Sequence, residues 1–64
     1  MMTPDERMTS NRQTYSATAQ EWLRAALQHL ANRDYEKARV CAETATRHLR
    51  IAETGQIPAD FQIF

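Results

Sequence analysis

The chain has 64 residues, with eight Lys or Arg against eight Asp or Glu and a single cysteine. A domain of this size buries only roughly 60% of the surface that its unfolded chain exposes, so such chains are usually reinforced by disulfides, a metal ion or a second copy. One cysteine excludes an intrachain disulfide, and the balanced charge gives no net field that would attract nucleic acid or anionic lipid.

The sequence also lacks a metal-binding motif and a targeting signal. His29, Cys41 and His48 are the soft ligands, and no CxxC or HxxxH spacing pairs them, so we expect no metal and no cofactor. No apolar run approaches the ~20 residues that cross a bilayer, and "MMTPDERMTS" lacks the basic start and apolar centre of a signal peptide. We therefore expect a cytoplasmic protein with a reduced thiol and no membrane association.

The first residues contain two competing signals for a helix start. "TPDE" offers Thr3 as an N-cap with Pro4 in the first turn, and "SNRQ" repeats the capping box from Ser10 to Gln13. Because Thr9, Ser10 and Asn11 are poor helix formers, we expect the second signal to be used. Residues 1–10 would then form a flexible or short helical N-terminal arm, followed by a helical hairpin over residues 11–54.

The first helix of this hairpin is expected over about residues 11–32. Its apolar residues recur at the spacing of one helical stripe: Tyr15, Ala19, Trp22, Leu23, Ala26, Leu27 and Leu30. "ANRD" interrupts the stripe, and Asp34 is a suitable N-cap for a second helix over about residues 34–54. Gly55 is the residue expected at a left-handed C-cap, so the second helix should end at Thr54.

The second helix carries a heptad-spaced stripe of mostly small residues. The stripe consists of Tyr35, Ala38, Ala42, Ala45, Leu49 and Ala52. So small a seam permits close approach of another helix but offers little area to bury. A linker of about three residues requires the helices to fold back as an antiparallel hairpin, with Trp22, Leu27, Cys41 and Ile51 partly off the seam.

The predicted fold is therefore all-α: an antiparallel helical hairpin that pairs into a dimeric four-helix bundle, with an extended apolar C-terminal tail. Residues 55–64 form this docking tail, whose Phe61, Ile63 and Phe64 supply the bulk that the alanine-lined helix lacks. The sequence leaves open whether the tail packs on its own hairpin, on a second chain, or on another protein as a peptide motif.

Two family resemblances follow from these residues. Trp22, Ala26, the "DY" of Asp34 and Tyr35, Ala38 and Ala45 resemble the spacing of a tetratricopeptide-type helical hairpin. This resemblance covers about residues 19–52. It implies that the hairpin must associate with another copy or be covered by the tail, because a single repeat cannot bury both of its faces.

The stretch "WLRAALQHLANRDYEKARVCAETATRHL" also resembles the core hairpin of HEPN proteins, many of which are RNases with an Arg-x4-6-His motif. That resemblance implies Arg24 and His29 as the motif pair. Residues five apart on a continuous helix diverge by about 140°, however, so we favour a non-catalytic protein in which His29 covers the hairpin edge.

The remaining chemistry has ordinary structural interpretations. Cys41 has no activating neighbours at local spacing, so we expect a small buried side chain rather than a nucleophile or redox sensor. His48 lies near two arginines and is expected at a solvated helix end, with an anion site as the alternative. Arginines on the second helix alternate with glutamates, which is typical of a solvated surface.

The function that this pattern favours is a small non-catalytic protein-interaction or regulatory module acting as a homodimer. The prevalence of Arg and Ala is typical of a GC-rich genome and favours a phage or accessory-locus origin. A second protein could bind through the tail or through an aromatic face made by Tyr15, Trp22 and Tyr35, although core packing of these residues is the favoured interpretation. A small nucleic-acid-binding regulator is the alternative function. The predicted protein-interface residues are Tyr15, Trp22, Leu23, Leu27, Leu30, Tyr35, Ala38, Ala42, Ala45, Leu49, Phe61, Ile63 and Phe64.

Overall fold

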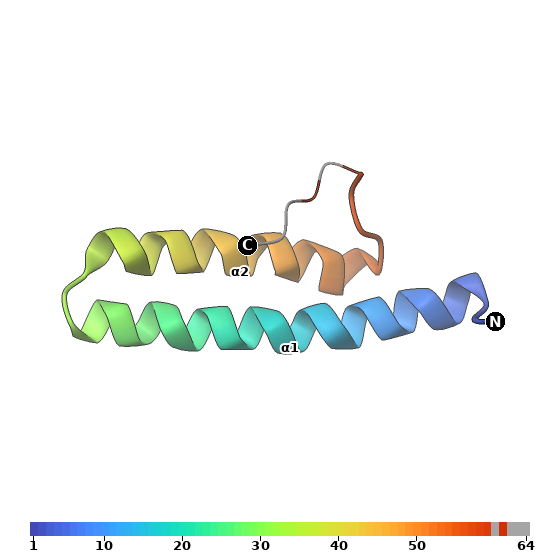
Figure 1. The fold of residues 1–64 in the computed structure, drawn as a ribbon, viewed down its shortest axis with the longest axis horizontal. Helices are drawn as coiled ribbons and strands as arrows, with labels where there is room; N and C mark the ends of the chain where they lie inside the picture. The colour runs from blue at the N-terminus through green and yellow to red at the C-terminus, as the bar shows by residue number, and fades with distance from the viewer. Residues whose placement is uncertain (60, 62–64) are drawn as a thin grey trace.

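Two antiparallel helices form the fold of this computed structural model, which describes residues 1–59 and 61. Helix α1 spans Pro4–Ala31 and helix α2 spans Tyr35–Thr54, and they lie side by side along most of the length of α2 (Figure 1). The molecule measures 45 × 20 × 16 Å, so the hairpin is a single layer. The predicted all-α antiparallel hairpin is confirmed for the described residues. Within a single layer each helix buries only the stripe that faces the other, and a large part of its circumference stays free.

Helix α1 begins seven residues before the expected start at residue 11. The side chain of Thr3 accepts a hydrogen bond from the Glu6 amide at 3.2 Å, and Pro4 occupies the first turn. The first capping signal is therefore used, and residues 4–10 are continuous with the helix instead of forming a separate arm. The cause is a tertiary contact: the Asn11 side-chain amide donates a hydrogen bond to the Gly55 carbonyl at 3.1 Å, so this part of α1 is packed against the end of α2.

The turn between the helices has the hydrogen bonds of a Schellman motif. The Asp34 amide donates to the His29 carbonyl at 2.9 Å, and the Arg33 amide donates to the Leu30 carbonyl at 3.0 Å. The motif needs a left-handed residue after the cap at Asn32, and Arg33 fills that position with φ of 60°. The Asp34 side chain then accepts from the Lys37 amide at 3.3 Å, which confirms Asp34 as the N-cap of α2.

Helix α2 ends at Thr54, as predicted, on the left-handed cap Gly55 with φ of 75°. The Gly55 amide donates to the Ile51 carbonyl at 2.6 Å. A Cβ at this position would lie 3.0 Å from the Met8 Cβ and 3.1 Å from the Met8 carbonyl oxygen. Glycine is therefore required twice here, by the backbone conformation and by the close approach of α1.

The seam between the helices does not use the predicted heptad stripe. Ala38 and Ala45 are buried as expected, but the seam of α2 continues through Cys41 and His48, while Tyr35, Ala42 and Leu49 are exposed. The set 38, 41, 45 and 48 has the same 3-4-3 spacing as the predicted stripe, so a heptad pattern of small residues does not choose between the two. Of the four residues expected to lie partly off the seam, Leu27 is exposed and Trp22 is half-buried, whereas Cys41 and Ile51 are buried.

Candidate protein interface

The exposed apolar side chains of the two helices provide the most informative surface of the molecule. Leu23, Leu27 and Leu30 of α1 are 41%, 66% and 50% exposed, and Tyr35 and Leu49 of α2 are 65% and 44% exposed. We call the surface made by these side chains and the exposed Ala42 the leucine face. Five of the predicted interface residues with bulky side chains thus lie outside the hairpin core, together with Ala42.

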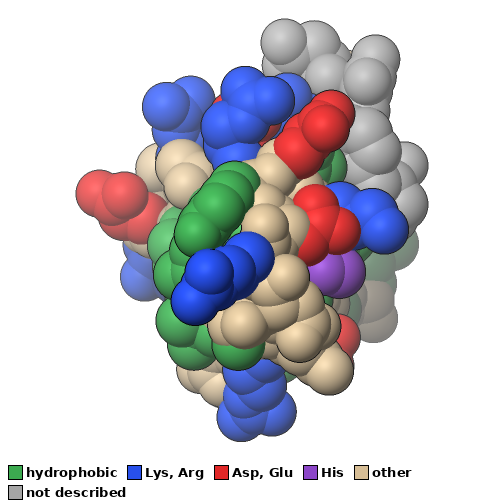
Figure 2. Space-filling model, turned by 90° about the vertical axis from the view of Figure 1, so that its left-hand side faces the viewer, with side chains coloured by type: hydrophobic (Ala, Val, Ile, Leu, Met, Phe, Trp, Pro, Cys, Tyr) green, Lys and Arg blue, Asp and Glu red, His purple; other side chains and the backbone are tan. Residues whose placement is uncertain are grey.

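Helix geometry places both halves of the leucine face on the same side of the hairpin. At about 100° per residue, the three leucines lie about a quarter turn from the centre of the α1 seam, and Tyr35, Ala42 and Leu49 lie about a quarter turn from the centre of the α2 seam. Because the helices run in opposite directions, the two turns carry both sets to one side. In the end view of Figure 2, hydrophobic side chains gather along one side of the molecule.

Charged residues border the leucine face without interrupting it. Arg39 and Glu43 pair along the edge of α2 at 3.9 Å, and their side chains are 69% and 60% exposed. Arg24 projects about a quarter turn away from the leucine stripe of α1 by the same helical period. An apolar centre with a charged rim is the usual anatomy of a protein interface.

The size of the leucine face is large for so small a molecule. Taking about 200 Å² for each fully exposed side chain of this size, the exposed fractions leave on the order of 500 Å² of apolar surface. The largest apolar patch on a typical monomer is about 300–600 Å² and is often functional. The hairpin carries such a patch on a chain of only 64 residues.

The other predicted interface residues lie elsewhere. Ala38 and Ala45 are buried in the helix seam, and Tyr15 and Trp22 are half-buried on the seam side of α1. Tyr35 lies on the leucine face, so the three aromatic residues Tyr15, Trp22 and Tyr35 do not share one side of the hairpin. Phe61 is half-buried, whereas Ile63 and Phe64 lie outside the described residues.

Phe61 belongs to a cluster of three rings on the side of the hairpin away from the leucine face. Its ring centroid lies 5.8 Å from that of Tyr15 and 5.4 Å from that of His48, both in edge-to-face geometry, and the Tyr15 and His48 centroids are 5.6 Å apart. Edge-to-face pairs of this kind are favourable because a ring edge is positive and a ring face negative. Phe61 therefore packs on Tyr15 and His48 of its own hairpin.

His48 is buried in this cluster, so the expected solvated helix end is wrong. Its Nδ1 lies 2.8 Å from the Thr44 carbonyl oxygen, which can only accept. Nδ1 therefore carries the hydrogen and donates it, and the imidazole serves as a packing group of α2. The sequence signal for this role is the 3-4-3 spacing that His48 shares with Ala38, Cys41 and Ala45.

The candidate reactive groups named from the sequence lie apart from one another among the described residues. Cys41 is buried, as expected, and no group of three His, Cys, Asp or Glu side chains among residues 1–59 and 61 is arranged to hold a metal ion. Arg24 is exposed and His29 half-buried on one continuous helix, where their side chains diverge by about 140°. The Arg-x4-6-His spacing therefore does not bring the two groups together.

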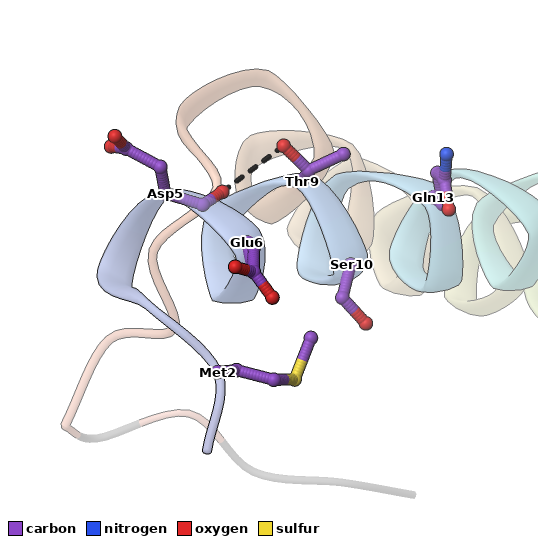
Figure 3. A pocket seen from close by; sticks show the side chains of 6 residues that line it. All are labelled: Met2, Asp5, Glu6, Thr9, Ser10 and Gln13. Atoms are coloured by element: carbon purple, nitrogen blue, oxygen red, sulfur yellow. Dashed lines mark hydrogen bonds between the residues drawn. The ribbon is translucent and has the colours of Figure 1, made fainter.

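A shallow hollow of about 490 Å³ lies beside the first turns of α1 (Figure 3). It is lined by Met2, Asp5, Glu6, Thr9, Ser10 and Gln13. Its polar groups serve the helix start: the Thr3 hydroxyl donates to a Glu6 carboxylate oxygen at 3.2 Å, and the Thr9 hydroxyl donates to the Asp5 carbonyl at 3.0 Å. Asp5 and Glu6 also suit the positive end of the helix dipole.

No protein-family model, no curated protein sequence and no solved structure matches this chain. The tetratricopeptide and HEPN resemblances therefore depend on residue spacing alone. Within the described part of the chain, neither helix combines the length and the hydropathy that a membrane span requires.

Proposed function

We propose that the protein is a small non-catalytic interaction module that works as a homodimer, in which two hairpins bury their leucine faces against each other as a four-helix bundle. The leucine face is the observation that carries this proposal. A partner surface that covers it must be apolar and must lack charge at its centre, and a second leucine face meets both conditions. An interface formed by the same surface on both chains is the commonest arrangement in soluble oligomers.

The composition of the hairpin core supports the same conclusion. Ile51 is the large side chain that is completely buried, and the rest of the buried apolar set is Ala19, Ala38, Cys41 and Ala45. Each buried methylene stabilises the folded state by only about 0.8 kcal/mol. Because an alanine side chain is a single methyl group, a core made mostly of alanines contributes little to the stability of the hairpin. The leucines and Tyr35 are the large apolar side chains of the leucine face that stay exposed, and pairing would bring them into a shared core.

The size of the exposed area supports the same proposal. Two leucine faces of this size, with their charged rims, would bury on the order of 1,200 Å², which is the lower end of the range for specific interfaces. We therefore expect a dimer of modest affinity that dissociates on dilution.

Sedimentation velocity over a wide concentration range tests this proposal. The wild-type chain should sediment as a dimer at high concentration, and Leu27→Glu should shift it to monomer because a carboxylate would be buried in the apolar centre. Gln28→Glu is the matched control: it adds the same charge one residue along α1, on the far side from the leucine face. A monomeric wild type at high concentration, or an equal effect of both variants, would refute the proposal.

The nucleic-acid alternative has weaker support from the surface charges. Lys37 lies 3.6 Å from an Asp34 carboxylate oxygen, and Arg39 is paired with Glu43, so two cations of α2 already have acidic neighbours. Phosphate contacts make binding strongly salt-dependent. A mobility shift of short DNA or RNA at low salt, lost on raising the salt, would favour this alternative, and its absence would remove it.

A further inference from the structure

The leucine face has an uneven distribution of bulk along the hairpin. The contacts of Asn11 with Gly55 and of Tyr15 with His48 show which residues of the two helices lie level. Counting from these contacts toward the turn places Leu23 about level with Ala42, Leu30 near Tyr35, and Ser16 about level with Leu49. The turn end of the face is therefore bulky, and the opposite end is sparse.

The same positions are almost symmetrical in spacing about the middle of the face. On α2, Tyr35 and Leu49 each lie seven residues, or about 10.5 Å, from Ala42. On α1, the positions that face the same way are Ser16, Gln20, Leu23, Leu27 and Leu30, which lie seven and three residues before Leu23 and four and seven residues after it. When the face is turned end for end, the small or polar positions of α1 (Ser16, Gln20) exchange with its bulky positions (Leu30, Leu27), and on α2 Tyr35 exchanges with Leu49.

This pattern distinguishes between the two ways in which a pair of identical hairpins can stack with antiparallel neighbours. If both turns were at the same end, Leu27, Leu30 and Tyr35 of the two chains would crowd into one layer, and the layer at the other end would be underfilled. If the turns are at opposite ends, each bulky end meets a sparse end. Protein interiors are packed evenly and tolerate neither voids nor overlap, so the second arrangement is favoured.

Given the proposed homodimer, we infer that its two-fold axis lies within the interface and runs across the leucine face, past Ala42 of α2 and Leu23 of α1. The two turns are then at opposite ends of the bundle. Helix α2 then stacks on α2 of the second copy, Ala42 meets Ala42, and Tyr35 packs against Leu49. The small side chain of Ala42 permits the closest approach of the two backbones at the axis. Leu23 meets its own counterpart on α1, and Leu30 packs over Ser16.

Disulfide trapping tests this register. In a Cys41→Ala background, Ala42→Cys should form a covalent homodimer under mild oxidation, because a disulfide needs Cα atoms within about 7 Å. Tyr35→Cys alone and Leu49→Cys alone should not cross-link, since each residue would lie about 20 Å from its own counterpart. A mixture of those two variants should cross-link, and circular dichroism checks that every variant keeps its helices.

A second measurement is independent of disulfide geometry. Nitroxide labels at Asn32→Cys in the same background report the distance between the two turns. Turns at opposite ends would separate the labels by about 25 Å or more along the bundle, from 1.5 Å per residue. A distance well below that, or a dimer in which Ala42→Cys does not cross-link, would overturn the register while leaving the homodimer intact. A chain that sediments as a monomer would instead refute the proposed function.

Discussion

Arg33 is the residue where a single substitution should make the hairpin more stable. It occupies the left-handed position of the Schellman motif, with φ of 60°, although it carries a Cβ. A left-handed conformation costs an L-residue about 1–2 kcal/mol relative to the right-handed region, and glycine avoids that cost. Part of the gain is offset because glycine also makes the unfolded chain more flexible.

For Arg33→Gly we therefore expect a net stabilisation of about 1 kcal/mol. For a domain of this size that corresponds to a rise of about 4–8 °C in the melting temperature. Thermal and urea unfolding followed by far-UV circular dichroism would measure both quantities. Protein concentration has to be held constant, because association also contributes to the apparent stability.

Two control variants separate the backbone effect from other causes. Arg33→Ala removes the same exposed side chain but keeps the Cβ, so its stability should change by less than about 0.5 kcal/mol. Gln28→Gly places glycine at an exposed position inside α1, where it should destabilise by about 1 kcal/mol. If Arg33→Gly were no more stable than Arg33→Ala, the argument from backbone conformation would be wrong.

Three further substitutions test the ends of α2 and the ring cluster by the same unfolding measurements. Gly55→Ala should cost about 2 kcal/mol or more, because the left-handed strain is added to the contact with Met8, and an unchanged stability would contradict the close approach of α1. Asp34→Ala should cost about 1 kcal/mol through loss of the N-cap, whereas Asp34→Asn should retain most of it. Phe61→Ala should cost about 1–2 kcal/mol through loss of the two ring contacts; no loss would show that the tail does not dock at Phe61.

The parts of this fold that local chemistry determines could be predicted from the sequence. Asp34 and Gly55 were both predicted at the ends of α2, because an N-cap and a left-handed C-cap depend on the residue itself and on backbone groups within one turn. The antiparallel hairpin follows from a linker too short for any other arrangement. Arg33 in the left-handed position could not be predicted, because glycine or asparagine is the usual residue there.

The start of α1 depends on contacts that the local sequence does not contain. Both Thr3 and Ser10 begin a capping box, and the poor helix formers Thr9, Ser10 and Asn11 favour the second. The contacts that favour the first start are with Gly55, which is 44 residues from Asn11 along the chain. The Asn11 side chain donates to the Gly55 carbonyl, and Met8 lies against Gly55. With those contacts made, residues 4–10 gain from staying helical.

The prediction of which α2 residues form the helix seam was wrong because it too depends on contacts outside the local sequence. Ala38 and Ala45 belong to two heptad stripes, one with Tyr35, Ala42 and Leu49 and one with Cys41 and His48. Small residues fit either choice, so the pattern alone does not decide which stripe is buried. The second stripe includes His48, whose ring contacts those of Tyr15 and Phe61, and burying this stripe leaves the bulkier one exposed.

This division of apolar residues leads to a last prediction about stability. Small residues form most of the buried core of one chain, while the leucines and Tyr35 face outward, so the proposed dimer would bury much of the exposed apolar surface between chains. Folding and association should therefore be coupled, and the melting temperature should rise with protein concentration. In Leu27→Glu that dependence should disappear, while Gln28→Glu should retain it. A wild-type melting temperature that is the same at low and high concentration would mean that the hairpin is held together by its alanine seam and the ring cluster alone.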